Sequence, residues 1–339
     1  MRRLAGMIFL VGQAASLPGR ADEPQPEASA AFAPDGSEAV PGPRAGAADS
    51  ALRYFDARTY RARFAVTVRA ARSGVRNVVA TCPVPVDWPE QQVQLVSETR
   101  PAQAAATVAE LPGLGAMLVV RVPALPAGAS VTVERVYEIT RSKVELTRDP
   151  AGLVVPDGLP RELRAFLKPA PGFDDRGRRV EKLAEALREP GDTAWATTRR
   201  YFDWVRQNVE YREGEFRGPL AALDAKAGDC EDMTALFVAL CRSAGIPARG
   251  VWVEGHAYPE FYLADAQGGG WWIPAQVSGP EWFGTMADYQ PILQKGDRAR
   301  DPIRRRDGRY IAQTARAIGG PVELSVTRTI LDMPGPAGP

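Results

Sequence analysis

The chain has 339 residues, and 42 Lys and Arg stand against 41 Asp and Glu, which leaves a formal net charge of +1. A balance this close to neutral argues against a protein dedicated to nucleic acid or to an anionic surface. The composition is 45% hydrophobic, which excludes wholesale disorder, and the length predicts roughly two domains. Three cysteines and one histidine are too few for a zinc finger or a three-histidine site, so we expect no metal and no cofactor.

The first 50 residues have the composition of an export signal followed by a linker. Arg2 and Arg3 precede the apolar run 4–11, and small residues lead to a predicted cleavage after Ala21. Residues 22–50 are rich in Pro, Ala, Gly and acidic residues without periodicity, which predicts a disordered linker. No apolar run reaches the ~18 residues of a transmembrane segment. We therefore expect a signal peptide over 1–21 and a periplasmic or secreted protein.

Residues 51–150 have the pattern of short strands. Apolar and polar residues alternate over 60–70, and similar stretches at 77–81, 92–96, 117–122 and 131–139 are separated by turns that contain Pro or Gly. This pattern predicts an antiparallel β-sandwich domain over 51–150. Cys82 stands at a strand end, and we interpret it as a small buried hydrophobe.

Helical periodicity begins after Pro150. Apolar stripes predict helices over 180–187 and 195–209, the second with Asp192 as its N-cap. A third helix begins around residues 228–232 and ends at Gly245. Strands are predicted at 248–254, 258–264, 271–274 and 322–330, with a turn at 267–270. The result is an α+β domain over 151–330, with a disordered tail at 331–339.

Cys230 is placed in the first turn of the third helix. The partial positive charge of a helix N-terminus stabilises a thiolate, whereas the neighbouring Asp229, Glu231 and Asp232 oppose it unless they cap N–H groups or pair with cations. Position alone leaves the reactivity open. Cys241 lies in the apolar stripe near the other end of the same helix and is predicted to be core.

His256 is the single histidine of the chain, so any mechanism that uses an imidazole base must use this residue. It stands at the start of a predicted strand. A cysteine on a helix and a histidine on the strand packed against it form the nucleophile and base of cysteine acyl-transfer enzymes. The alternative is an ordinary surface or core histidine.

The order of motifs resembles the transglutaminase-like superfamily over residues 160 to 285. That family has a Gly-x-Cys motif opening a helix, a helix end Arg-x-x-Gly-Ile-Pro-Ala-Arg, a strand beginning His-x-Trp-x-Glu and a strand reading Gly-Trp-x-x-x-Asp-Pro. The counterparts here are residues 228–230, 242–249, 256–260 and 272–276, and residues 201–211 resemble the helix that precedes the cysteine. The resemblance implies a papain-like α+β core, helices packed on an antiparallel sheet, and N-terminal β-domains commonly precede such cores in bacteria.

The resemblance also implies site residues, with two departures from the family pattern, of which Tyr258 in place of the tryptophan is the milder. Cys230 is the implied nucleophile and His256 the implied base, but Gln276 stands where the family usually has an aspartate. A glutamine carbonyl can accept the imidazole N–H but adds no negative charge for an imidazolium. Asp265 and Asp288 are alternative orienting carboxylates.

Further residues are weaker candidates for the predicted site. The backbone N–H of Cys230 is the first candidate for an oxyanion hole. Trp204 and Tyr211 either line the acyl site or belong to the core. The arginine-rich stretch 298–309 is interpreted as a charged patch or turn, and it is also a candidate for holding an acidic substrate.

The resulting expectation is an exported cysteine enzyme that hydrolyses amide or peptide bonds of a protein or peptide substrate. Transfer of the acyl group to an amine, as in a protein cross-linker, is an alternative. A non-catalytic module that binds peptide or glycan is the main rival, since the missing aspartate can mark a retired site. A structural role is a further alternative, in which the β-sandwich contacts a cell-envelope partner.

Overall fold

The structure is a computed structural model, and it describes residues 50–170, 173, 177–301, 305 and 307–332. The predicted signal peptide, residues 22–49 of the predicted linker and the tail from 333 lie outside the described residues. No helix in the described part of the chain is long and apolar enough to cross a membrane.

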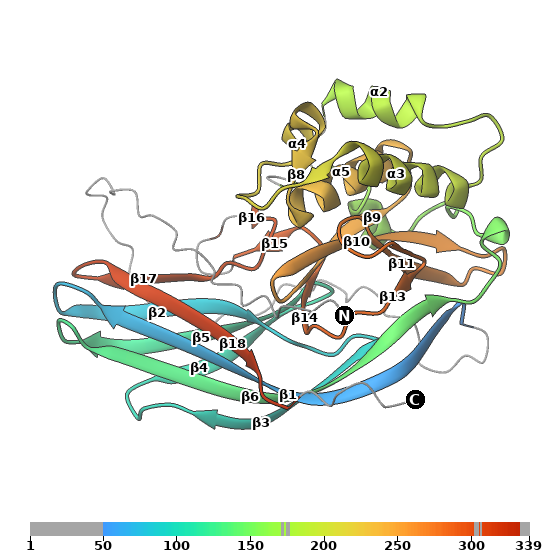
Figure 1. The fold of residues 1–339 in the computed structure, drawn as a ribbon. Coiled ribbons are helices and arrows are strands. Elements are labelled where there is room, and N and C mark those ends of the chain that lie inside the picture. The colour runs from blue at the N-terminus through green and yellow to red at the C-terminus, as the bar shows by residue number, and fades with distance from the viewer. Residues whose placement is uncertain (1–49, 171–172, 174–176, 302–304, 306, 333–339) are drawn as a thin grey trace, which may run out of the picture. The chain divides into compact units, whose positions relative to one another are not determined.

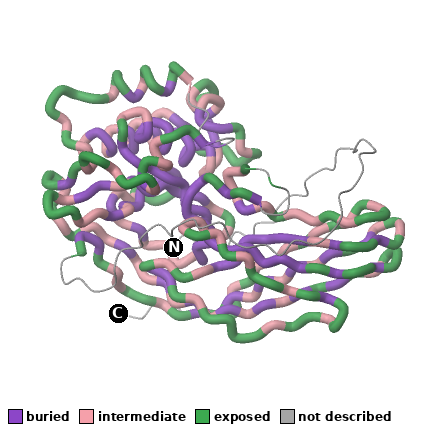
Figure 2. Tube along the Cα trace, turned by 180° about the vertical axis from the view of Figure 1, so that it is seen from behind, coloured by how far each residue is buried: buried purple, intermediate pink, exposed green. Residues whose placement is uncertain are grey.

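The N-terminal part is rich in antiparallel strands. Its six strands are β1 Leu52–Ala70, β2 Val75–Val84, β3 Gln91–Thr99, β4 Ala105–Leu111, β5 Gly115–Leu125 and β6 Ser130–Leu146. Along β1 and β6 buried residues alternate with less buried ones, as expected for a sheet with one face on the core (Figure 2). The buried faces of β1, β2, β5 and β6 share one hydrophobic cluster that includes Phe64, Leu118 and Ile139. Cys82 is fully buried in this cluster, as predicted.

Two strands near the C-terminus return to this part of the fold. β18 Val322–Ile330 pairs with β1, and β17 Thr314–Ile318 pairs with β2. The prediction located the strand 322–330 with the same bounds but assigned it to the second domain. The alternation of apolar and polar residues indicates that a strand has a buried face, but it does not indicate which sheet edge the strand joins.

The helices α2 Arg178–Ala186, α3 Ala194–Asn208, α4 Pro219–Ala225 and α5 Cys230–Ser243 lie together over one group of strands (Figure 1). The short helix α1 Arg161–Ala165 and a 3-10 turn η1 at Pro150–Gly152 precede them in the chain. α5 is buried over nearly its whole length and packs against β9 Ala248–Val253 and β10 His256–Ala264. Two short strands, β7 Glu210–Tyr211 and β8 Ala227–Gly228, pair in parallel just before α5.

The predicted N-cap of α3 is wrong by one residue. Thr193 caps the helix, and its hydroxyl accepts the N–H of Ala196 at 3.1 Å. Asp192 instead accepts the N–H of Glu189 and pairs with Arg200. Asp and Thr are both good caps, so the residue types alone do not choose between two adjacent positions.

One continuous sheet joins the two parts of the described chain. Its strand order is β12-β11-β10-β9-β14-β5-β2-β17, with β4 paired to β5. The remaining members are β11 Gly270–Gln276, β12 Trp282–Phe283 and β14 Ile292–Lys295, while β13 Thr285–Met286 pairs with β6 and β15 Ala299–Arg300 with β16 Asp307–Gly308. β14 makes the junction, because Gln294 is paired with both Gly115 and Trp252.

Gly115 permits this junction. Its φ is 145°, and a Cβ at this position would lie 2.8 Å from the backbone oxygen of Leu293. No larger residue fits there without moving β14.

Candidate active site

Cys230 is the first residue of α5, as predicted, and its position depends on the residues around it. Asp229 is the N-cap, and its side chain accepts the N–H of Asp232 at 2.8 Å. A Cβ on Gly228 would lie 2.6 Å from the Cβ of Asp232, so the glycine of the Gly-x-Cys motif is required by packing. Asp232 itself is buried and accepts the N–H groups of Arg217 and Gly218, both at 2.7 Å, which ties the start of α4 to the start of α5.

The thiol of Cys230 is a weak acid in this environment. Burial raises its pKa to about 11, and the negative charges of Asp229 and Glu231 act in the same direction. The backbone amide of Ala257 hydrogen-bonds the thiol and opposes this shift. Near neutral pH Cys230 is therefore held as a thiol, and the helix N-terminus does not outweigh burial.

His256 and Gln276 form the central hydrogen bond of the site. Nε2 of His256 lies 2.8 Å from Oε1 of Gln276. With the glutamine oxygen as acceptor, Nε2 carries the proton and Nδ1 is left unprotonated, able to accept a proton. Gln276 is buried, whereas His256 and Cys230 are only partly buried and so remain accessible.

Chain neighbours bring Cys230 to the same place. Ala257, whose amide contacts the thiol, directly follows His256, and Thr234 of α5 donates its hydroxyl to the backbone oxygen of Ala257 at 3.2 Å. The structure thus places the start of α5 against the start of β10, the strand whose first residue is His256. Asp265 and Asp288 have other partners, since Asp265 pairs with Arg148 and accepts backbone N–H groups of its own turn, while Asp288 accepts the N–H of Gln290.

Arg206 holds the end of β11 and was not identified from the sequence. Its guanidinium donates to the backbone oxygens of Gln276 at 3.0 Å and Gly279 at 3.1 Å. Pairing of Gln276 with Trp282 in β12 fixes the strand from its other side. An arginine on a helix face gives no sequence signal for such backbone contacts, so only the tertiary structure reveals this role.

Tyr211 and Trp204, the two aromatic residues predicted to line the acyl site or the core, differ in exposure and packing. Tyr211 pairs with Gly228 in register, and the residue is exposed. Partial desolvation raises the pKa of its phenol, and the nearby Cys230 acts in the same direction. Trp204 packs against the hydrophobic core. Tyr211 is therefore the aromatic residue of the two that a substrate could contact.

The arginine-rich stretch reaches the site through Arg309. Nε of Arg309 lies 2.5 Å from Oε1 of Glu231, next to Cys230, and its guanidinium lies 4.1 Å from the ring centroid of Phe216. Residues 302–304 and 306 of the stretch lie outside the described residues. The described residues contain no cluster of three or more His, Cys, Asp or Glu that could hold a metal.

The other thiols have no role at this site. Cys241 and Cys82 are free and buried, and burial raises the pKa of both. Cys241 is thus part of the core, as predicted.

Helices that pack on an antiparallel sheet, with a cysteine opening the central helix, define the transglutaminase-like class of fold. Residues 181–276 match the transglutaminase-like superfamily, so the chain contains a transglutaminase-like domain, and the resemblance found in the sequence is confirmed. No curated protein matches the chain.

Solved structures with this architecture are similar to the chain. A candidate cysteine protease from Cytophaga hutchinsonii superposes with a TM-score of 0.57 at 17% identity, over 83% of this chain and 93% of that chain. At this identity the likeness concerns the fold alone. A candidate protease from Parabacteroides distasonis matches with a TM-score of 0.25 at 12% identity, over 68% of this chain and 48% of that chain, a superposition too loose to inform the fold.

Proposed function

We propose that the protein is a cysteine-dependent enzyme that hydrolyses amide bonds of a peptide or protein, with Cys230 as nucleophile, His256 as base and Gln276 as the residue that orients His256. The observation that carries the proposal is the hydrogen bond of 2.8 Å between His256 and Gln276 beside the helix that Cys230 opens. An imidazole fixed in one tautomer next to a cysteine at a helix start is the arrangement that acyl transfer requires.

The reaction proceeds through an acyl-enzyme. Nδ1 of His256 removes the proton of the Cys230 thiol as sulfur attacks the substrate carbonyl, and a tetrahedral oxyanion forms. The backbone N–H of Cys230 is the candidate donor to this oxyanion. His256 then protonates the leaving amine, a thioester remains, and water activated by the same imidazole releases the carboxylic acid.

Two features favour a general-base mechanism over a preformed ion pair. Burial and the acidic neighbours keep the proton on Cys230, whose pKa is raised to about 11. Gln276 offers an oxygen acceptor but no negative charge, so an imidazolium gains less here than beside a carboxylate. Proton transfer therefore accompanies the attack of sulfur on the carbonyl.

The test is turnover of a fluorescence-quenched peptide library by the wild type, Cys230→Ala and His256→Ala. We expect each variant to lose at least about 10³-fold in kcat/KM. Cys82→Ala is the matched control, since it removes a buried thiol that belongs to the core of the β-rich part, and it should retain activity. Binding of peptides without turnover, unchanged in Cys230→Ser, would instead support a binding module. Incorporation of a labelled amine into protein by the wild type would support the cross-linker.

We also propose that the protein is exported, on the order of charged, apolar and small residues over 1–21. The test is fractionation of cells that express the full chain, with N-terminal sequencing of the product. A product that begins at Asp22 outside the cytoplasm is the expected result, and an intact N-terminus in the cytoplasm would refute it.

The β-rich part is proposed to contact an envelope partner, which a cross-linking experiment on intact cells would test.

A further inference from the structure

A cavity of about 200 Å³ lies on the face of the sheet that is turned away from α5. Phe261 of β10 faces the helices, because its ring packs against Phe237 of α5. Successive residues of a strand point to opposite faces, and Tyr258, Glu260 and Tyr262 accordingly line the cavity. The cavity is thus separated from the packed face of α5 by the sheet itself.

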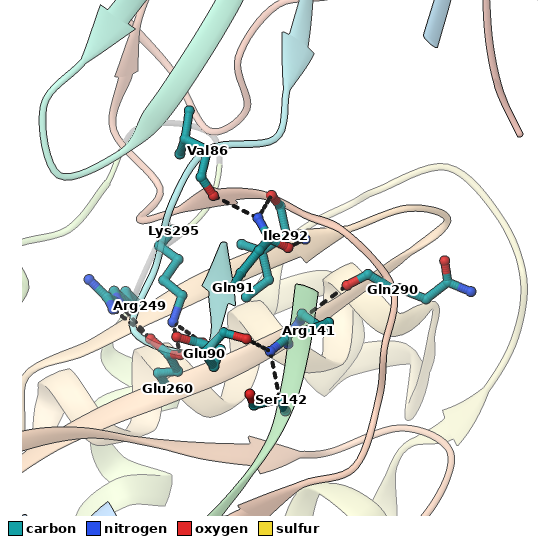
Figure 3. Close-up of polar contacts among 10 residues, drawn as sticks. All are labelled: Val86, Glu90, Gln91, Arg141, Ser142, Arg249, Glu260, Gln290, Ile292 and Lys295. Carbon is teal, nitrogen blue, oxygen red and sulfur yellow. Dashed lines mark hydrogen bonds and ion pairs between the residues drawn. The ribbon is translucent and has the colours of Figure 1, made fainter. Parts of the chain in front are cut away.

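Its polar side is a chain of buried ion pairs (Figure 3). Glu260 lies 2.7 Å from Arg249 and 2.7 Å from Lys295, and Lys295 lies 2.5 Å from Glu90. All four line the cavity, and each is at most 5% exposed. Two carboxylates are balanced by two cations, so the chain of ion pairs needs no charged ligand to complete it.

Aromatic rings form the other walls. The aromatic residues that line the cavity lie on β1, in the segment before β3, on β10 and on β11, and they are Tyr54, Trp88, Tyr258, Tyr262, Trp271 and Trp272. The rings of Trp271 and Trp272 point to opposite faces of β11, and that of Trp272 lies on the same face as Tyr262. The guanidinium of Arg249 lies 4.0 Å from the ring centroid of Trp272, and the ring of Tyr262 meets Trp272 edge-on at 5.4 Å. These contacts hold the Trp272 ring in one orientation at the cavity wall.

Two polar groups at the cavity lack a partner within the described part of the chain. The hydroxyl of Tyr258 makes no hydrogen bond with any described residue, although this residue is only 1% exposed. Nε1 of Trp88 is buried and also has no partner there. A buried polar group without a partner is costly, and a ligand that supplies one is favoured by that cost.

We propose that this cavity binds an uncharged sugar ring. The C–H faces of a sugar ring pack on aromatic rings, and its hydroxyl groups both donate to carboxylates and accept from Tyr258, Trp88 and the cations. A purely aromatic ligand would cover these polar groups without bonding them, which is unfavourable. The carboxylates and cations of the ion-pair chain already satisfy one another. An anionic ligand would in addition face Glu162, a third carboxylate in the cavity lining.

The test is calorimetric titration of the full-length protein with glucose and N-acetylglucosamine, with indole and glucuronate as comparators. We expect at least one neutral sugar to bind more tightly than indole and glucuronate. Tyr258→Phe should weaken sugar binding about tenfold, the value of one hydrogen bond to a buried group, and should leave thermal stability unchanged.

Tyr60 is the matched control for Tyr258, and its substitution should affect stability but not sugar binding. The hydroxyl of Tyr60 donates to the backbone oxygen of Tyr289 at 2.6 Å, and Tyr60 does not line the cavity. Tyr60→Phe should lower thermal stability and leave sugar binding unchanged. Cys230→Ala should bind sugar like the wild type, which separates this proposal from the proposed amide hydrolysis.

Three results would overturn the proposal. The first is absence of sugar binding to the wild type, and the second is tighter binding of indole or glucuronate than of both neutral sugars. The third is sugar binding that Tyr258→Phe and a second variant, Trp88→Phe, both leave unchanged.

Discussion

The imidazole of His256 is hydrogen-bonded through Nε2 to the side-chain oxygen of Gln276, at 2.8 Å, and not to a carboxylate. An amide acceptor sets the tautomer of the ring as a carboxylate would, but it provides no charge to stabilise the protonated ring. Gln276 therefore orients the His256 ring but adds no charge that would stabilise its protonated form, and in the proposed mechanism this difference can be measured.

Replacing Gln276 separates orientation from charge. Gln276→Ala should lower kcat about 10²-fold, because the ring loses its fixed position, with little change in KM. Gln276→Asp keeps an acceptor and adds a charge that stabilises an imidazolium, so it should lower the pH at which Cys230 becomes reactive. The measurement is kcat together with the pH profile of thiol labelling. Equal activity in wild type and Gln276→Ala would show that this contact does not serve catalysis.

Thiol labelling reports the protonation of Cys230 directly. Its pKa of about 11 predicts that iodoacetamide labelling rises with pH to a midpoint well above the ~8.5 of a free thiol. Because Cys82 and Cys241 are buried, peptide mass spectrometry of the native protein should find label at Cys230 alone. A midpoint below 8 would contradict the general-base mechanism and indicate a thiolate–imidazolium pair.

The charge of Glu231 contributes to this shift. Its carboxylate lies next to Cys230 and raises the pKa of the thiol, so Glu231→Gln should move the labelling midpoint to lower pH. Arg309 offsets part of that charge through its ion pair with Glu231, which makes the expected change modest. Asp224→Asn, on the exposed side of α4, is the control and should leave the midpoint in place. A midpoint that rises in Glu231→Gln would be the contrary result.

The buried pair of Arg242 and Asp297 should govern stability. The two side chains lie 2.5 Å apart with no exposed surface, and Arg242 also donates to the backbone oxygen of Ala248. Asp297→Asn removes this carboxylate from the buried guanidinium and should cost up to about 3–5 kcal/mol of unfolding free energy, measured with urea. The double variant Arg242→Met with Asp297→Leu should recover much of this loss. If the double variant loses as much unfolding free energy as Arg242→Met and Asp297→Leu lose when measured singly and added together, the pair does not behave as a coupled unit.

Parts of the site could be predicted because the signal is local. The acidic cap before Cys230, the apolar stripe behind it and the stop at Gly245 define α5 within a few residues, as helix capping and periodicity allow. The motif order also pointed to Gln276 beside His256, and these two side chains are in contact.

Other parts could not be predicted because they depend on contacts distant in sequence. Arg206 supports Gln276 from 70 residues away, and β14 inserts between β5 and β9 although it is four residues long. The sequence could not decide whether the helix N-terminus makes Cys230 a thiolate. Burial of the thiol raises its pKa and favours the neutral form.

By itself the sequence determined which elements form and which residues carry chemistry, because capping, periodicity and a single histidine are properties of short stretches of chain. The tertiary structure alone decided the assembly of one sheet from both parts of the chain, the protonation of the thiol and the enclosure of a cavity by Glu90, Arg249, Glu260 and Lys295. The reason is physical: desolvation and ion pairing depend on what surrounds a group in space, and those neighbours come from segments far apart in the sequence.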